Sequence, residues 1–214
     1  MRLRFFFFFL AAGLGAAQAE VISIFSGDDL TGSSEWNNMT GANVLVNPYA
    51  APIWASSTLG GRWISYGLTG AGQTSPSNVS MNAGNIEGNP TAIFFERFYL
   101  PGYAMSGGLW VWADDTAMVL IDGVPAFNSS SGVNHDAHCR NGVIGCQPGE
   151  GAYISLAGLD EGDHSLEFRV YQLWGDSFGL LYEGGVTAAP EPSSLLLVGS
   201  GAVAAWRWVR RRRQ

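Results

Sequence analysis

Two adjacent carboxylates, Asp114 and Asp115, stand between two short apolar runs and mark a sharp turn or a bulge. Carboxylate oxygens at a loop tip are the hard ligands that Ca²⁺ prefers. The same side chains could instead cap a tight turn by accepting hydrogen bonds from backbone N–H groups. The residue types therefore leave two interpretations of this pair open, a calcium site and a capped turn.

A second candidate for chemistry is the string Gly-Asp-Ser-Phe-Gly at residues 175–179, which has the Gly-x-Ser-x-Gly form found around the nucleophile of many hydrolases. Such a nucleophile needs a strand before it and a helix after it, whereas residues 180–182 read as a strand. We therefore interpret the string as a hairpin turn. A serine hydrolase that uses His164 and a nearby acid remains the alternative.

Tryptophans are the third group of interest, because their rings either stack on sugars at a sheet surface or fill a core. Trp110 and Trp112 alternate with Leu109 and Val111, so both faces of this predicted strand are apolar. We predict that the tryptophans of the central region belong to the core. They are Trp36, Trp54, Trp63, Trp110, Trp112 and Trp174. The alternative is that, of the two pairs on the strand that carries Trp110, one is exposed or is covered by a loop.

The beginning of the chain has the pattern of a secretory signal peptide. Arginines precede an apolar run over residues 5–14, and Ala17-Gln18-Ala19 has the small-x-small form of a cleavage site. We predict that signal peptidase removes residues 1–19 and that the mature chain starts at Glu20.

The other end carries Pro190-Glu191-Pro192, then an apolar stretch over residues 195–209, then four arginines at 210–213. This order and spacing resemble a PEP-CTERM protein-sorting tail. The resemblance implies a Gram-negative bacterial exported protein, held transiently in the inner membrane by a short transmembrane helix within residues 190–214. It also implies that an exosortase-type transpeptidase cuts near the triplet and sends the protein to the cell surface or the medium.

The region between these ends, residues 20–189, is strongly acidic. Seventeen acidic residues against four arginines and no lysine give it a net charge of −13. Nucleic acids and anionic membranes need basic surfaces, so both are excluded as partners of this region. The charge suits a soluble exported protein or one that binds cations.

Two cysteines, Cys139 and Cys146, lie in one loop with His135, Asp136 and His138. Two histidines and two cysteines could hold zinc, but their spacing does not match a zinc finger. Export would place the cysteines in an oxidising compartment, where a pair usually forms a disulfide. We therefore predict a Cys139–Cys146 disulfide.

The elements that must position these residues are strands. Short apolar runs punctuated by Gly, Pro and Asn predict one all-β domain over residues 20–189, an antiparallel sandwich or jelly roll. Asp122-Gly123 predicts a two-residue hairpin. The predicted strands cover residues 21–25, 44–46, 63–66, 92–100, 109–113, 117–121, 124–127, 153–156, 164–173 and 178–182.

Three blocks of this region, residues 112–124, 162–170 and 178–182, resemble the core of other PEP-CTERM domain proteins. They are also distantly similar to PA14-type and galactose-binding-like β-sandwiches. In PA14-like adhesins an Asp-Asp pair holds a calcium ion that in turn holds sugar hydroxyls. The resemblance implies that role for Asp114 and Asp115.

These observations together predict an exported, non-enzymatic β-sandwich of the cell surface or of the exopolysaccharide matrix. Its expected role is structural or adhesive, with Ca²⁺-assisted binding of glycan. The alternative is a secreted hydrolase that acts on matrix polymer.

Overall fold

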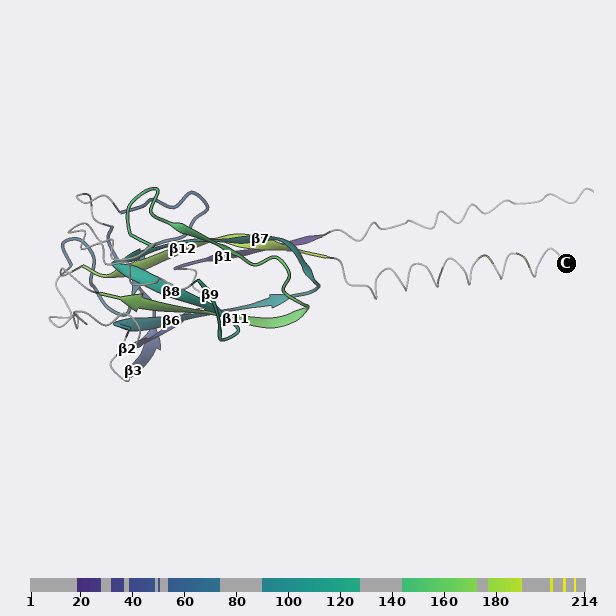
Figure 1. Cartoon of the computed structure of the whole chain (residues 1–214), viewed down its shortest axis with the longest axis horizontal. Coiled ribbons are helices and arrows are strands. Elements are labelled where there is room, and N and C mark those ends of the chain that lie inside the picture. Colours follow the sequence, from purple (N-terminus) through teal and green to yellow (C-terminus); the bar gives the residue numbers. More distant parts are fainter. Residues whose placement is uncertain are drawn as a thin grey trace, which may run out of the picture.

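The chain forms two antiparallel sheets (Figure 1), which confirms the predicted all-β class. A large cluster of buried hydrophobic side chains from both sheets forms the main core. The structure is a computed structural model. It describes residues 19–27, 32–36, 39–48, 50, 54–73, 90–127, 144–172, 177–189, 201, 206 and 210. The predicted signal peptide before Ala19 and the Pro190-Glu191-Pro192 triplet lie outside these residues.

One sheet, sheet A, has the strand order β10-β7-β12-β5-β4, and β1 also pairs with β12. The other, sheet B, has the order β3-β2-β6-β11-β8-β9. The bounds in sheet A are β1 Glu20–Phe25, β4 Val44–Leu45, β5 Ile64–Ser65, β7 Ala104–Asp114, β10 Ala152–Ser155 and β12 Gly179–Ala188. Those in sheet B are β2 Ser33–Trp36, β3 Met39–Ala42, β6 Ala92–Leu100, β8 Thr116–Ile121, β9 Val124–Phe127 and β11 Gly162–Tyr171.

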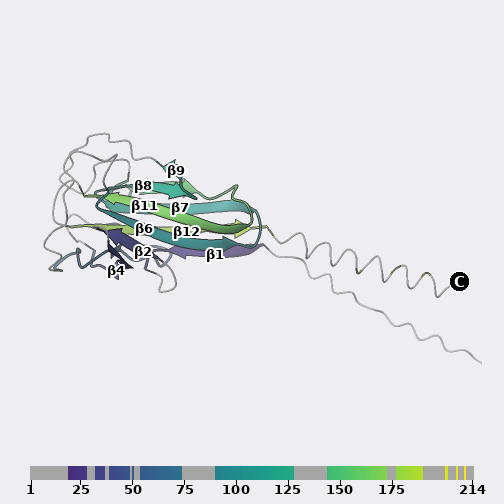
Figure 2. The ribbon, with the colours of Figure 1, turned by 90° about the horizontal axis from the view of Figure 1, so that it is seen from below.

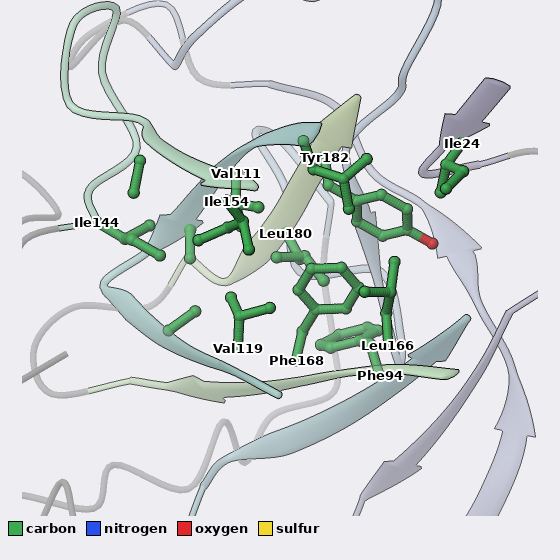
Figure 3. Close-up of a cluster of buried hydrophobic side chains, with 14 of the residues drawn as sticks. Ile24, Phe94, Val111, Val119, Ile144, Ile154, Leu166, Phe168, Leu180 and Tyr182 are labelled. Carbon is green, nitrogen blue, oxygen red and sulfur yellow. The ribbon is translucent and has the colours of Figure 1, made fainter. Parts of the chain in front are cut away.

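The core follows the period-two alternation of the strands. Leu166, Phe168 and Val170 of β11 are fully buried, as their spacing predicts. Phe168 stacks on Tyr182 of β12, with ring centroids 4.5 Å apart, so this contact joins the two sheets (Figure 3). Buried aromatic pairs of this kind contribute about 0.5–1.5 kcal/mol beyond the area that they bury.

The two longest strands of sheet A, β7 and β12, are longer than the sequence predicted. Each contains a pair of glycines, at which the predicted strand stopped short. Gly107-Gly108 of β7 and Gly184-Gly185 of β12 lie opposite one another, with Gly108 paired to Gly185. In sequence, glycine weakens a strand prediction. In the fold, the missing side chains let the two backbones pair closely, and a Cβ at Gly185 would lie 2.6 Å from the carbonyl oxygen of Ile22 on β1.

The predicted hairpin at Asp122-Gly123 is confirmed. It joins β8 to β9, and both residues have positive φ, 51° at Asp122 and 77° at Gly123. Two successive residues with positive φ form the turn that suits the twist of a two-residue hairpin.

The Asp114–Asp115 turn is a corner between the sheets. β7 ends at Asp114 in sheet A and β8 begins at Thr116 in sheet B, so Asp115 is the single residue between these two strands. The peptide bond between Asp114 and Asp115 is cis. The sharp turn predicted at this pair is therefore present, but it lies where the chain crosses between the layers and not at a loop tip.

The first and last strands of the domain are neighbours. Glu20 of β1 lies opposite Ala188 of β12, so the chain enters and leaves the sandwich at one end, which we call the terminal pole (Figure 1 and Figure 2). Asp114 pairs with Gly179 at the other end of β12, which we call the corner pole.

The predicted short transmembrane helix lies mostly outside the described residues. Within the described part of the chain, no helix is long and apolar enough to cross a membrane. Of the segment 190–214 only Gly201, Trp206 and Arg210 are described, each with a helical backbone. The guanidinium of Arg210 lies 4.8 Å from the ring centroid of Trp206. The membrane helix therefore stays a prediction.

Candidate functional site

The corner pole holds the two adjacent carboxylates. Asp114 is 4% exposed and Asp115 is 1% exposed, so neither stands at a solvated loop tip as predicted. The indole Nε1–H of Trp54 donates to Oδ2 of Asp114 at 3.1 Å. The backbone N–H of Asp115 donates to the carbonyl of Tyr171 at 3.0 Å, which ties the corner to β11. The acidic pair is thus built into the interior of the sandwich end.

Trp54 is held in place by a second, smaller hydrophobic cluster. Its ring lies 4.2 Å from that of Trp63, centroid to centroid, and Trp63 Nε1 donates to the carbonyl of Ala55 at 2.8 Å. The predicted core placement is confirmed for Trp54 and Trp63. The members of this cluster are Val46, Trp54, Ala55, Trp63, Cys146 and Leu181, with Trp112 packed against them.

The donor set at the corner fits calcium in kind. Asp114 and Asp115 supply carboxylate oxygens. Thr116 follows Asp115 and Gln172 follows Tyr171, so both are next in the chain to the hydrogen bond between Asp115 and Tyr171, and both are fully buried. Hydroxyl and amide oxygens are hard donors as well. Across the described ranges there is no group of three or more His, Cys, Asp or Glu side chains that could hold a metal. A calcium ion here would complete its shell of six to eight oxygens with water and further oxygens.

Of the predicted cysteine pair, only Cys146 is described. It is fully buried and is not a free thiol. Cys139 lies outside the described residues, together with His135, Asp136 and His138. The Cys139–Cys146 disulfide therefore stays a prediction.

A pocket of about 600 Å³ near the terminal pole is lined in part by the polar side chains of Asp122, His164 and Ser165. No spacing in the sequence predicts that these three residues meet. His164 Nδ1 lies 2.7 Å from Oδ2 of Asp122, and His164 Nε2 lies 2.8 Å from the carbonyl oxygen of Asp160. Two acceptors around one imidazole favour its protonated form. Burial alone would lower the pKa of His164, but the hydrogen bonds to Asp122 and Asp160 outweigh it and raise this pKa.

The partner carboxylate shifts in the opposite direction. Burial by itself would raise the pKa of Asp122, and the hydrogen bonds from His164 and Ser165 outweigh it and lower this pKa. The hydroxyl of Ser165 lies 3.4 Å from Oδ1 of Asp122, and its N–H donates to the same oxygen at 2.8 Å. The sequence places Asp122 in a hairpin and His164 in a strand, but only the register of β11 against β8 brings them together.

The outer face of sheet A carries exposed aromatic rings. Leu109 and Val111 of β7 are fully buried in the core, and alternation turns Trp110 and Trp112 to the other face. Trp110 is 46% exposed, so its predicted core placement is wrong. Trp112 is half-buried against the second cluster. Trp174 lies outside the described residues, and the side chain of Trp36 is not described.

Comparison with known proteins identifies one part of the chain. Residues 188–213 match the family model of the PEP-CTERM protein-sorting motif. No curated protein and no solved structure matches the chain. The predicted likeness to PA14-type and galactose-binding-like sandwiches is therefore without a matching structure. The C-terminal tail is similar to the sorting motif that exosortase recognises, which marks an exported protein that passes through a transient membrane-anchored step.

Proposed function

We propose that this chain is a structural or adhesive protein of the cell surface or the exopolysaccharide matrix. In this proposal it has no catalytic activity and binds glycan with the help of Ca²⁺ at Asp114 and Asp115. The observation that carries the proposal is the sorting motif at residues 188–213, since it implies delivery to the envelope. The net charge of −13 between residues 20 and 189 agrees with a protein that meets cations and glycans rather than nucleic acid.

The calcium part of the proposal is supported by the residue types at the corner, where two adjacent carboxylates, Asp114 and Asp115, supply the hard oxygens that Ca²⁺ prefers. The hydrogen bond from Trp54 orients the carboxylate of Asp114 before any ligand arrives. β12 has ten residues and spans about 30 Å, so the corner pole would face away from the membrane while the tail is anchored.

The calcium test compares the melting of the exported protein in Ca²⁺ and in EDTA. Calcium at one hundred times its dissociation constant would stabilise the folded protein by about 2.7 kcal/mol, which corresponds to a rise of several degrees. The double variant Asp114→Asn, Asp115→Asn should lose this rise. Identical melting curves of the wild-type protein in Ca²⁺ and EDTA would remove the metal and leave a structural role for the pair.

The processing part of the proposal is tested on the released protein. Signal peptidase would cut after Ala19 and exosortase near Pro190-Glu191-Pro192. The β1–β12 pairing sets Glu20, the first residue after the first cut, opposite Ala188. Intact-mass measurement should give a chain that starts at Glu20 and ends within or close to the triplet. A released protein that keeps either terminal segment contradicts this scheme.

The alternative, a secreted hydrolase acting on matrix polymer, has less support. A catalytic histidine needs a free ring nitrogen that takes a proton from the nucleophile. In His164 one ring nitrogen contacts Asp122 and the other contacts the carbonyl of Asp160. Residues 180–182, which follow the Gly-x-Ser-x-Gly string, belong to a strand rather than to the helix that a nucleophile elbow requires.

A further inference from the structure

We propose that the outer face of sheet A carries a calcium-independent binding site for neutral polysaccharide, formed by Trp110 and Tyr153. We call these two residues and the small residues beside them the aromatic face. The site goes beyond the calcium-assisted binding proposed for the corner pole. It uses different side chains and needs no metal.

The two rings lie side by side on neighbouring strands. Tyr153 of β10 is the register partner of Trp110 of β7, and their ring centroids are 5.6 Å apart with an interplanar angle of 60°. Trp110 is 46% exposed and Tyr153 is 52% exposed. Contiguous apolar patches on a protein surface often mark sites that bind ligands or other proteins.

Neighbouring residues of sheet A restrict the orientation of both rings. Trp110 stacks on Trp112 at 6.1 Å and 26°. Trp112 packs over Gly151, where an added Cβ would lie 2.5 Å from its indole nitrogen. The ring of Tyr153 occupies the space above Gly108, where an added Cβ would lie 2.6 Å from the phenol oxygen. A ligand would therefore meet rings whose orientation is already fixed, which lowers the entropic cost of binding.

The row of residues beside the rings is small and hydroxylated. Register pairing across four strands places Ser155, Gly108, Gly185 and Ser23 in one line. The next line carries Ser106 opposite Thr187. Apart from the ring of Tyr153, which covers Gly108, the described residues of this row add only small side chains, and Ser23 and Ser155 carry hydroxyl groups that a sugar could contact.

The described residues paired with the two rings leave no exposed charge beside them. Glu183, which lies opposite Trp110 on β12, is 2% exposed, and its carboxylate accepts hydrogen bonds from Ser57, Thr58 and the N–H of Leu59. This carboxylate is therefore withdrawn from the surface although Glu183 is the register partner of Trp110. A neutral face on an acidic domain selects a neutral ligand.

A neutral polysaccharide is the occupant that fits these properties. Pyranose rings offer an apolar C–H face for stacking on aromatic rings and hydroxyls for hydrogen bonding at their edges. Nucleic acid bases also stack, but their phosphates would be repelled by the net charge of −13, as would the carboxylates of an acidic polysaccharide. A purely apolar partner would leave the neighbouring hydroxyls poorly matched.

The site is tested by native affinity electrophoresis of the exported protein in gels that contain hydroxyethyl cellulose, galactomannan or laminarin, with alginate as the acidic comparison. We expect retardation in at least one neutral gel, unchanged by EDTA, and none in alginate. Trp110→Ala and Tyr153→Ala should each weaken binding about tenfold, and Trp110→Phe should retain most of it. The matched control is Tyr99→Ala, which removes a 53% exposed ring from sheet B and should leave binding unchanged.

Melting curves of each variant establish that the fold is intact before binding is compared. The proposal is overturned if no neutral polysaccharide retards the protein, or if Trp110→Ala and Tyr153→Ala bind as the wild type does. It is also overturned if sedimentation shows a dimer that Trp110→Ala dissociates, or if phosphatidylcholine vesicles capture the protein through the same residues.

The outcomes also separate this site from the corner. Binding that survives EDTA and the Asp114→Asn, Asp115→Asn variant, but not Trp110→Ala, supports the aromatic face and removes the need for calcium. Binding lost in EDTA and in the aspartate variant, but kept in Trp110→Ala, supports the corner site and overturns the aromatic face.

Discussion

Tyr182 of β12 donates its phenol hydrogen to Oε2 of Glu96 on β6, at an oxygen–oxygen distance of 2.8 Å. Both side chains are buried, and the two strands belong to different sheets. This hydrogen bond therefore joins the sheets through the core, next to the ring contact between Tyr182 and Phe168. A carboxylate inside a core is stable only where such donors reach it.

Tyr182→Phe tests this link. The substitution keeps the ring and removes one donor to a buried carboxylate, so we expect a loss of about 1–3 kcal/mol in the free energy of unfolding, measured with urea. Tyr99→Phe removes an exposed hydroxyl from the outer surface of sheet B and should change this energy by less than about 0.5 kcal/mol. Equal effects of the two substitutions would show that the Tyr182–Glu96 bond contributes nothing.

Glu183→Gln should alter the response of stability to acid. Burial by itself would raise the pKa of Glu183, but hydrogen bonds from Ser57, Thr58 and Leu59 outweigh it and lower this pKa from its usual 4.5. A lowered folded-state pKa stabilises the fold above pH 4.5, and the contribution is lost as the pH falls below 4.5 through the folded-state pKa. Urea unfolding at a series of pH values should show a shallower acid limb in the Gln variant. Parallel curves for the two proteins would contradict this assignment.

The His164–Asp122 pair should stabilise the fold over a defined pH range. The pKa of His164 is raised from 6.5, so its contribution is full below pH 6.5 and is lost as the pH rises through the folded-state value. The pKa of Asp122 is lowered from 3.8, so its contribution is full above pH 3.8 and is lost in stronger acid. NMR titration should place the His164 midpoint above 6.5, and Asp122→Asn should move it down. A His164 midpoint that Asp122→Asn leaves unchanged would show that the carboxylate does not hold the imidazolium.

The Cys139–Cys146 disulfide is tested by peptide mapping. Non-reducing digestion of the exported protein should yield the two cysteine peptides linked, and reduction should separate them. The bond closes a short loop, so its removal should cost about 2 kcal/mol of stability. Free thiols in the exported protein, or one bound zinc per chain, would restore the metal interpretation of this loop.

The sequence was most informative where one periodicity dominates. Residues 92–100 and 124–127 were predicted with the bounds that the structure gives, because they contain dense apolar residues and end at a Pro-Gly or begin after an Asp-Gly pair. β2 and β3 were missed, because polar residues such as those of Ser33-Ser34-Glu35 carry no strand periodicity at an edge. About half of β7 and half of β12 were also missed, because the glycine pairs in these strands weaken the strand prediction.

The candidate sites could not be predicted from local sequence patterns, because they depend on contacts between residues that are far apart in the chain. Both faces of β7 are apolar in sequence, so its alternation does not decide which face joins the core; this depends on the sheet that lies opposite. Leu109 and Val111 belong to the same buried cluster as residues of β8 and β11, and this leaves Trp110 on the outer face. Likewise, no spacing rule connects Trp54 to Asp114, which are sixty residues apart.

The pairing of β1 with β12 has a mechanical consequence. While the tail is anchored, any load on the protein enters at Ala188, the end of a ten-residue strand that is bonded to β7 along one edge and to β1 along the other. A pull along β12 acts at right angles to these hydrogen bonds, so the bonds share the load in shear instead of breaking one at a time. The tethered end of the domain is therefore its mechanically resistant end, and β12 would transmit force from the anchor to the aromatic face without first being peeled from the sheet.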